Sequence, residues 1–133
     1  MPDKILQCVV VTPERELLDQ AADFVVLPMS DGELGVLPGR APLIGRLGAG
    51  ELRITTNNQT QRYYVDGGFA QVRANVVTVL TDRALRPQEI NVSAAERVLS
   101  AEALTGLSAA EAEPLYKNQQ RARAQLRVAR DRA

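Results

Sequence analysis

The stretch that decides the fold reads Asp31-Gly-Glu-Leu-Gly-Val-Leu-Pro-Gly-Arg-Ala-Pro-Leu43. Glycine and proline recur through it at Gly35, Pro38, Gly39 and Pro42. Glycine permits tight turns, and proline cannot continue a helix or a central strand. The chain must therefore turn, extend briefly and turn again. This pattern predicts the shaped edge of a β-structure and not a helix.

Short apolar blocks surround this stretch, from about residue 5 to residue 81. Residues that favour turns separate them, including Asn57-Asn58 and Asp66-Gly67-Gly68. Blocks of this length and spacing predict an all-β sandwich, in which one face of each strand is buried. Cys8 is expected to be a buried packing residue. The same alternation predicts core positions for Phe69, Val72, Val77 and Val79.

After Pro87 the composition changes toward alanine, glutamate and arginine, which favour helices. Ser93-Ala-Ala-Glu96 has the spacing of a capping box, so a helix is expected to begin there and to end near Gly106. Ser108-Ala-Ala-Glu111 repeats this signal. Pro114 follows it closely, however, and predicts a break before a main second helix.

The end of the chain is a basic arm, although the whole chain has no net charge. Residues 114–133 carry six basic side chains and one acidic side chain, a net charge of +5. The apolar stripe along this arm, which includes Ala122 and Leu126, is narrow, so the helices should be held weakly. We expect a mainly β fold with α, in which an N-terminal β-sandwich over residues 1–86 is followed by a C-terminal α-helical hairpin over residues 87–133.

Catalytic chemistry has little support in this composition. The chain has no histidine, and its single cysteine leaves no plausible metal site. Gly45, Gly48 and Gly50 lie close together, but no lysine with serine or threonine follows them to complete a phosphate-binding loop. We therefore expect no catalytic residues, no cofactor and no metal, and a protein that is not an enzyme.

Two other classes of protein remain as alternatives. A free-standing β-sandwich adaptor could use the basic helical tail to bind acidic protein or nucleic acid. A sugar-binding module would need aromatic platforms, but there is no tryptophan and there are only three tyrosines. The few aromatic residues do not interleave with the arginines, which argues against single-stranded nucleic acid. Because no apolar run approaches ~20 residues and no secretion signal is visible, a cytosolic location or its equivalent is expected.

The opening stretch and a second one, Val65-Asp-Gly-Gly-Phe-Ala-Gln-Val72, together resemble the epsilon subunit of F-type ATP synthases. That family carries a G-x-L-G-hydrophobic-L-P-G-His-A-P-L run and a later G-G-F/I run that leads into V-T-V-L. The resemblance extends along nearly the whole chain. It implies a non-catalytic central-stalk (rotor) subunit that joins the gamma shaft to the membrane c-ring for ion-gradient-driven ATP synthesis. Its C-terminal helices would restrain ATP hydrolysis in the alpha/beta catalytic head.

The resemblance also implies a location and three contact surfaces. The protein would be peripheral on the cytoplasmic side of the inner (plasma) membrane, or at the matrix or stromal equivalent, and would reach the membrane only through the complex. By motif position, Asp31 and Glu33 would face the c-ring. Thr12 and Arg40 would face gamma, and Arg40 stands where the family usually has histidine. The basic helix would meet an acidic loop of the beta subunit through Arg121, Arg123, Arg127 and Arg130.

Ile90-Asn-Val-Ser-Ala-Ala95 departs from the family's I/L-D-x-x-R-A motif. In many bacterial relatives the aspartate and arginine of that motif help to hold one ATP. Here Asn91 replaces the acid and Ala94 stands at the place of the arginine, so the guanidinium that could bind phosphate is gone. ATP binding is therefore not carried over to this chain.

Overall fold

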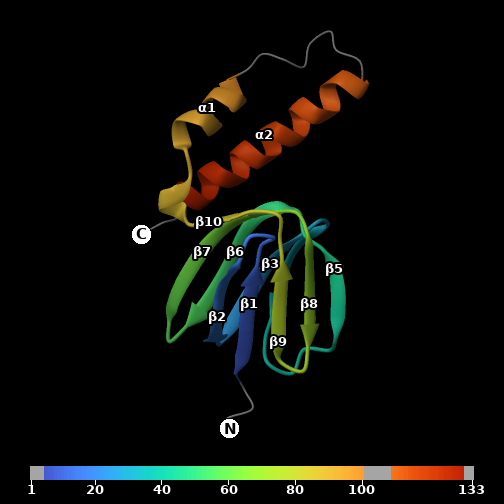
Figure 1. Cartoon of the computed structure of the whole chain (residues 1–133), viewed down its shortest axis with the longest axis vertical. Coiled ribbons are helices and arrows are strands. Elements are labelled where there is room, and N and C mark those ends of the chain that lie inside the picture. Colours follow the sequence, from blue (N-terminus) through green and yellow to red (C-terminus); the bar gives the residue numbers. More distant parts are fainter. Residues whose placement is uncertain (1–4, 101–108, 131–133) are drawn as a thin grey trace.

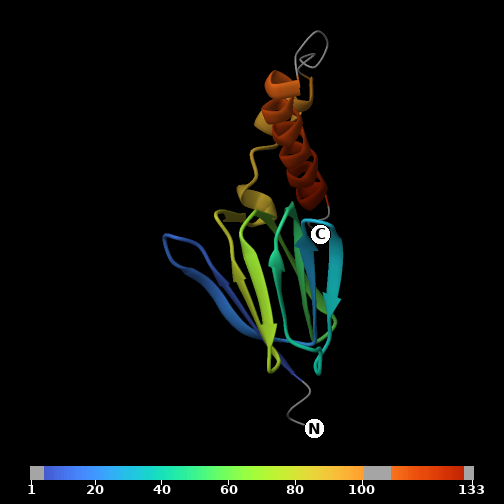
Figure 2. The same ribbon diagram turned by 90° about the vertical axis from the view of Figure 1, so that its right-hand side faces the viewer.

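The computed structural model describes residues 5–100 and 109–130 of the chain. Two five-stranded sheets face each other as a β-sandwich, and two helices lie at one end of it (Figures 1 and 2). The expected fold class is confirmed. We call the end beside the helices the helix end, and the opposite end, where the first strand begins, the far end.

The two sheets combine strands that are distant in sequence. Sheet A has the order β2-β1-β9-β8-β5, with β1 (Leu6–Val11), β2 (Glu16–Ala22), β5 (Leu43–Arg46), β8 (Phe69–Arg73) and β9 (Val76–Leu80). Sheet B has the order β10-β7-β6-β3-β4, with β3 (Phe24–Met29), β4 (Gly32–Val36), β6 (Ala49–Thr56), β7 (Gln59–Asp66) and β10 (Ala84–Leu85). Neighbouring strands are antiparallel, apart from the parallel pair β1 and β9.

The glycine- and proline-rich stretch connects the edges of the two sheets. It contains β4 at the edge of sheet B, turns through Pro38 and Gly39, and then enters β5 at the edge of sheet A. Gly39 has a φ of +87°, a conformation that side chains disfavour. Its N–H donates to Asn75 Oδ1 at 2.8 Å, which fixes the turn against the β8–β9 hairpin. The predicted turn, extension and second turn are therefore present.

The second glycine motif allows a close approach of two backbones at the helix end. Gly68 has a φ of +101°, and a Cβ atom there would lie 2.0 Å from the carbonyl oxygen of Leu80. Only glycine fits such a contact. Beside it, the Thr81 hydroxyl donates to the carbonyl oxygen of Gly67 at 2.8 Å. The motif therefore joins the start of β8 to the end of β9.

The main core lies between the sheets, where Val72, Val77 and Val79 are buried as predicted. Cys8 is fully buried there, and burial, with a smaller effect of the Asp19 charge, raises the pKa of its thiol to about 12. The expectation for Phe69 is wrong, because its side chain is 49 % exposed. Alternation along β8 points Ala70 and Val72 inward and Phe69 outward.

The helical part begins after β10 with a short 3-10 helix, η1 (Pro87–Glu89), and continues with α1 (Val92–Ser100) and α2 (Ala109–Arg130). The expected cap of α1 is wrong. The Asn91 side chain, and not Ser93, accepts a hydrogen bond from the Ala94 N–H at 2.9 Å. Asparagine is among the best capping residues, and Ser93 already lies inside the first turn. Gly106 and Ser108 lie outside the described residues.

The expected break at Pro114 is also wrong, because α2 runs through this residue without interruption. Pro114 is exposed and lies near the amino end of a long helix. A proline there removes one backbone hydrogen bond, and packing farther along the helix maintains the structure.

Two apolar stripes, and not one, run along α2. Ala122 and Leu126 form a cluster with Ala95 of α1, against which Leu99 also packs. Ala124 and Val128 belong to a different cluster, which contains Tyr64 of β7 and Ile90. The first stripe therefore holds the two helices together, and the second holds them to the sandwich.

Candidate interaction surfaces

The two carboxylates expected to face the c-ring lie together in the β3–β4 hairpin at the helix end. Glu33 forms a bidentate ion pair with Arg53, with Nη1–Oε2 at 2.9 Å and Nη2–Oε1 at 3.3 Å. Arg53 also pairs with Glu51 at 2.9 Å, and Glu51 is buried. The hydrogen bonds to Glu33 and then to Glu51 raise the pKa of Arg53. Glu33 is thus already paired within the chain, while Asp31 is exposed in the turn.

The two residues expected to face gamma are not brought together. Thr12 follows β1 at the helix end, where its backbone N–H donates to the carbonyl oxygen of Arg15 at 2.9 Å. Arg40 is exposed in the β4–β5 loop at the far end, beside the Gly39–Asn75 hydrogen bond. A single partner could touch both residues only if it extended along the length of sheet A.

Between these two positions, the outer face of sheet A exposes large apolar side chains. Ile44 is 72 % exposed, and Phe69 and Leu80, which are paired across β8 and β9, are 49 % and 51 % exposed. The Arg46 guanidinium lies over the Phe69 ring, 5.9 Å from its centroid. Sequence reasoning missed this face. The alternation of Phe69 with Ala70 and Val72 was the signal that could have revealed it.

On sheet B, the helices cover the end of the outer face. Tyr64 points outward from β7 and is fully buried in the cluster that includes Ala124 and Val128. Burial raises the pKa of Tyr64 to about 12, and the Asp66 carboxylate acts in the same direction. A tyrosine side chain buried in this way is a large apolar contact for α2.

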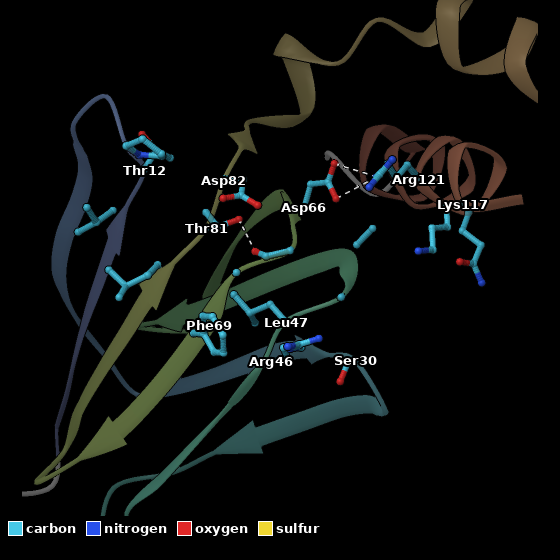
Figure 3. Close-up of a pocket in the computed structure, with 18 residues that line it drawn as sticks. Thr12, Ser30, Arg46, Leu47, Asp66, Phe69, Thr81, Asp82, Lys117 and Arg121 are labelled. Atoms are coloured by element: carbon cyan, nitrogen blue, oxygen red, sulfur yellow. Dashed lines mark hydrogen bonds and ion pairs between the residues drawn. The ribbon is translucent and has the colours of Figure 1, made fainter. Parts of the chain in front are cut away.

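Of the four arginines expected to meet beta, Arg121 is bound to the sandwich. Its Nε donates to Asp66 Oδ1 at 3.1 Å and lies 3.1 Å from Oδ2 (Figure 3). Arg123, Arg127 and Arg130 are exposed on α2. The structure therefore divides the predicted set into one arginine that is engaged and three that face solvent.

A cleft of about 880 Å³ lies between α2 and the strand ends. Figure 3 shows Asp66, Asp82 and Arg121 at its upper side, with Arg46 and Ser30 below. Acidic and basic side chains both line it, so its charge favours no single class of ion. Among residues 5–100 and 109–130, no group of three or more histidine, cysteine or carboxylate side chains is placed to hold a metal ion.

Residues 5–87 match the family model described as "ATP synthase, Delta/Epsilon chain, beta-sandwich domain". This match defines the class of the sandwich. The chain is also 54 % identical over 127 residues to the ATP synthase epsilon chain of Rhodopirellula baltica, covering 94 % of this chain and 98 % of that one. It is 46 % identical to the epsilon chain of Pelotomaculum thermopropionicum over 96 residues, 72 % of each chain. The chain belongs to the ATP synthase epsilon chain family.

Solved structures show the same fold. A chain of the Euglena gracilis mitochondrial ATP synthase matches with a TM-score of 0.73 and 21 % identity, covering 98 % of this chain and 79 % of that one. A chain of the Tetrahymena thermophila mitochondrial ATP synthase central stalk and c-ring matches with a TM-score of 0.67 and 15 % identity, covering 93 % and 96 %. In the described part of the chain, no helix is long and apolar enough to cross a membrane.

Proposed function

We propose that this chain is a non-catalytic central-stalk subunit of a rotary F-type ATP synthase, and that it couples gamma to the c-ring. The observation that carries the proposal is the near full-length identity of 54 % with a curated epsilon chain. A free-standing adaptor is not favoured, because the similarity covers the helices as well as the sandwich. The protein would be peripheral, on the cytoplasmic side of the membrane or its organellar equivalent, and would reach the membrane only through the complex.

Gamma would dock on the outer face of sheet A. Thr12 and Arg40 lie near opposite ends of this sheet, and Ile44, Phe69 and Leu80 supply exposed apolar surface between them. Large exposed apolar side chains grouped on one face are typical of a protein–protein interface. An arginine side chain is charged at every physiological pH, so a contact through this position would lack the pH dependence that a histidine could give it.

The c-ring would meet the β3–β4 hairpin at the helix end. Because Glu33 is already paired with Arg53, Asp31 is the carboxylate better placed to pair with a basic group of the ring. Exposed ion pairs contribute only ~0 to 1 kcal/mol, so the pair would orient the contact more than it would strengthen it.

The helices, residues 87–133, would form a regulatory domain separate from the sandwich of residues 1–86. Arg123, Arg127 and Arg130 are exposed and could meet an acidic loop of the beta subunit if the hairpin left the sandwich. Such a contact would restrain ATP hydrolysis without any catalytic role for this chain.

The docking proposal is tested by binding of the full chain to purified gamma. Phe69→Asp and Ile44→Asp place charges on the outer face of sheet A and should each weaken binding at least tenfold. Val98→Asp is the matched control, because Val98 is an exposed apolar residue of α1. Circular dichroism verifies that all three variants are folded. Unchanged binding by the two folded sheet A variants would place gamma elsewhere.

A further inference from the structure

Two neighbouring contacts, an ion pair and an apolar cluster, hold α2 to the sandwich. Asp66 is the last residue of β7, and Arg121 lies near the middle of α2 (Figure 3). About one and two turns farther along α2, Ala124 and Val128 share a buried cluster with Tyr64. Asp66 and Tyr64 are two residues apart on the same strand, so the polar and apolar contacts lie on one face of sheet B.

The hairpin can leave the sandwich as a unit. The cluster that joins the helices contains Ala95, Ala122 and Leu126, and none of these residues belongs to the cluster that contacts Tyr64. Undocking would break one cluster and leave the other intact. The Asp66–Arg121 pair would be broken in the same event, because its two carboxylate contacts bridge the surfaces that separate.

We propose that Asp66 is a latch that keeps the hairpin docked by occupying Arg121. The consequence in the complex rests on the proposed function, but the latch itself does not. In the docked state Arg121 is bound to a carboxylate of its own chain. In the undocked state the same guanidinium becomes available to an acidic group of the catalytic head. Two carboxylates thus compete for one arginine. The ratio of the docked to the undocked state depends on the difference in free energy between the two ion pairs.

This competition predicts different effects on ATP hydrolysis for substitutions at the two ends of the pair. Asp66→Asn weakens only the docked state, so it should increase undocking and strengthen the restraint on hydrolysis. Arg121→Ala removes the arginine from both states, so it should increase undocking without strengthening the restraint. An ion pair that merely added stability would not distinguish these two variants by their effect on hydrolysis.

Docking is measured first on the full chain alone. Cysteines at the exposed positions Gln59 and Gln120 carry spin labels, and Cys8 is buried and stays unlabelled. Double electron–electron resonance then reports the distance between β7 and α2. The side chains of Arg121 and Asp66 are 45 % and 22 % exposed, so Asp66→Asn should raise the undocked-to-docked ratio about two- to fivefold.

Two variants sharpen this measurement. Asp82→Asn also removes one carboxylate charge from the cleft, but it leaves the Asp66–Arg121 pair intact. It should therefore leave the undocked-to-docked ratio unchanged. The double exchange Asp66→Arg with Arg121→Asp should restore docking toward the wild-type level. The latch is overturned if Asp66→Asn gives the distance distribution of the wild type, or if its effect is no larger than that of Asp82→Asn.

ATP hydrolysis is then measured with the chain bound to gamma and the catalytic head. Asp66→Asn should lower the rate relative to wild type and to Asp82→Asn, and Arg121→Ala should not. A shifted distance distribution with unchanged hydrolysis would leave the latch standing and refute the regulatory part of the proposed function. An unshifted distribution would refute the latch whatever the rate of hydrolysis.

Discussion

Val128→Ala should undock the hairpin and leave it folded, whereas Leu126→Ala should loosen the hairpin itself. Val128 is fully buried against the sandwich cluster, and Leu126 is 6 % exposed in the cluster between the helices. Removing two methyl-sized groups at Val128 costs about 1.6 kcal/mol in transfer free energy, and an unfilled cavity brings the total to about 2 kcal/mol. This corresponds to a roughly thirtyfold change in the docking equilibrium. Leu126→Ala should cost about 2 to 3 kcal/mol.

Two readouts separate these effects. Spin labels at Gln59 and Gln120 report docking, and far-ultraviolet circular dichroism reports helix content. In the Val128→Ala variant, most molecules should no longer show the label-to-label distance of the docked state, and the helical circular dichroism signal should be unchanged. Leu126→Ala should lose helical signal while the sandwich stays folded. If Val128→Ala lost as much helical signal as Leu126→Ala, the two stripes would form one cooperative unit, and the argument for a hairpin that moves as a body would be wrong.

Four further outcomes are expected. Gly68→Ala should lower the free energy of unfolding in urea by roughly 2 to 5 kcal/mol, because its Cβ would meet the carbonyl oxygen of Leu80. Gly39→Ala, which has open space around it, should lower it by only about 1 kcal/mol. Millimolar ATP should not raise the melting temperature, although a ligand at one hundred times its dissociation constant would add ~2.7 kcal/mol, and a rise specific to ATP would contradict the interpretation of Asn91 and Ala94. The free energy of unfolding should fall as the pH rises from about 9 to 12. Burial raises the pKa values of Cys8 and Tyr64 to about 12, and both groups ionise at lower pH once the chain unfolds. A free energy of unfolding that stayed constant over this pH range would contradict their burial. The reconstituted complex should hydrolyse ATP faster, at low and moderate salt, with alanine at Arg121, Arg123, Arg127 and Arg130, and equal rates would show that these arginines form only a solvated surface.

Local sequence patterns predicted those parts of the fold that depend on local backbone chemistry. Asn57 and Asn58 adopt positive φ values between β6 and β7, as expected of turn residues, and the Gly67-Gly68 motif marks a close backbone approach. The outward position of Phe69 was missed because Phe69 and Val72 were both assigned to the core, although residues three apart on a strand point to opposite faces. Phe69 is paired with Leu80, which is exposed on the same outer face.

The candidate surfaces were predicted less completely, because ion pairs between distant residues leave no local pattern. Arg121 and Asp66 are 55 residues apart, so neither charge indicates the other. Glu33 and Arg53, 20 residues apart, pair across the outer face of sheet B in the same way. The second stripe of α2 was hidden because Ala124 and Val128 are small and contact a different partner from Leu126.

Gamma binding and regulation should be separable, because they use different faces of the sandwich. The outer face of sheet A, with Ile44 and Phe69 exposed, contains none of the residues that hold α2. The helices cover Tyr64 at the end of sheet B, so undocking uncovers that end. It would also open the cleft that α2 shares with Phe69 and Leu80, but it would remove no part of sheet A. A chain that ends at residue 86 should therefore bind gamma as tightly as the full chain. Weaker binding by this shortened chain, if it remains folded, would mean that the helices contribute to the gamma interface.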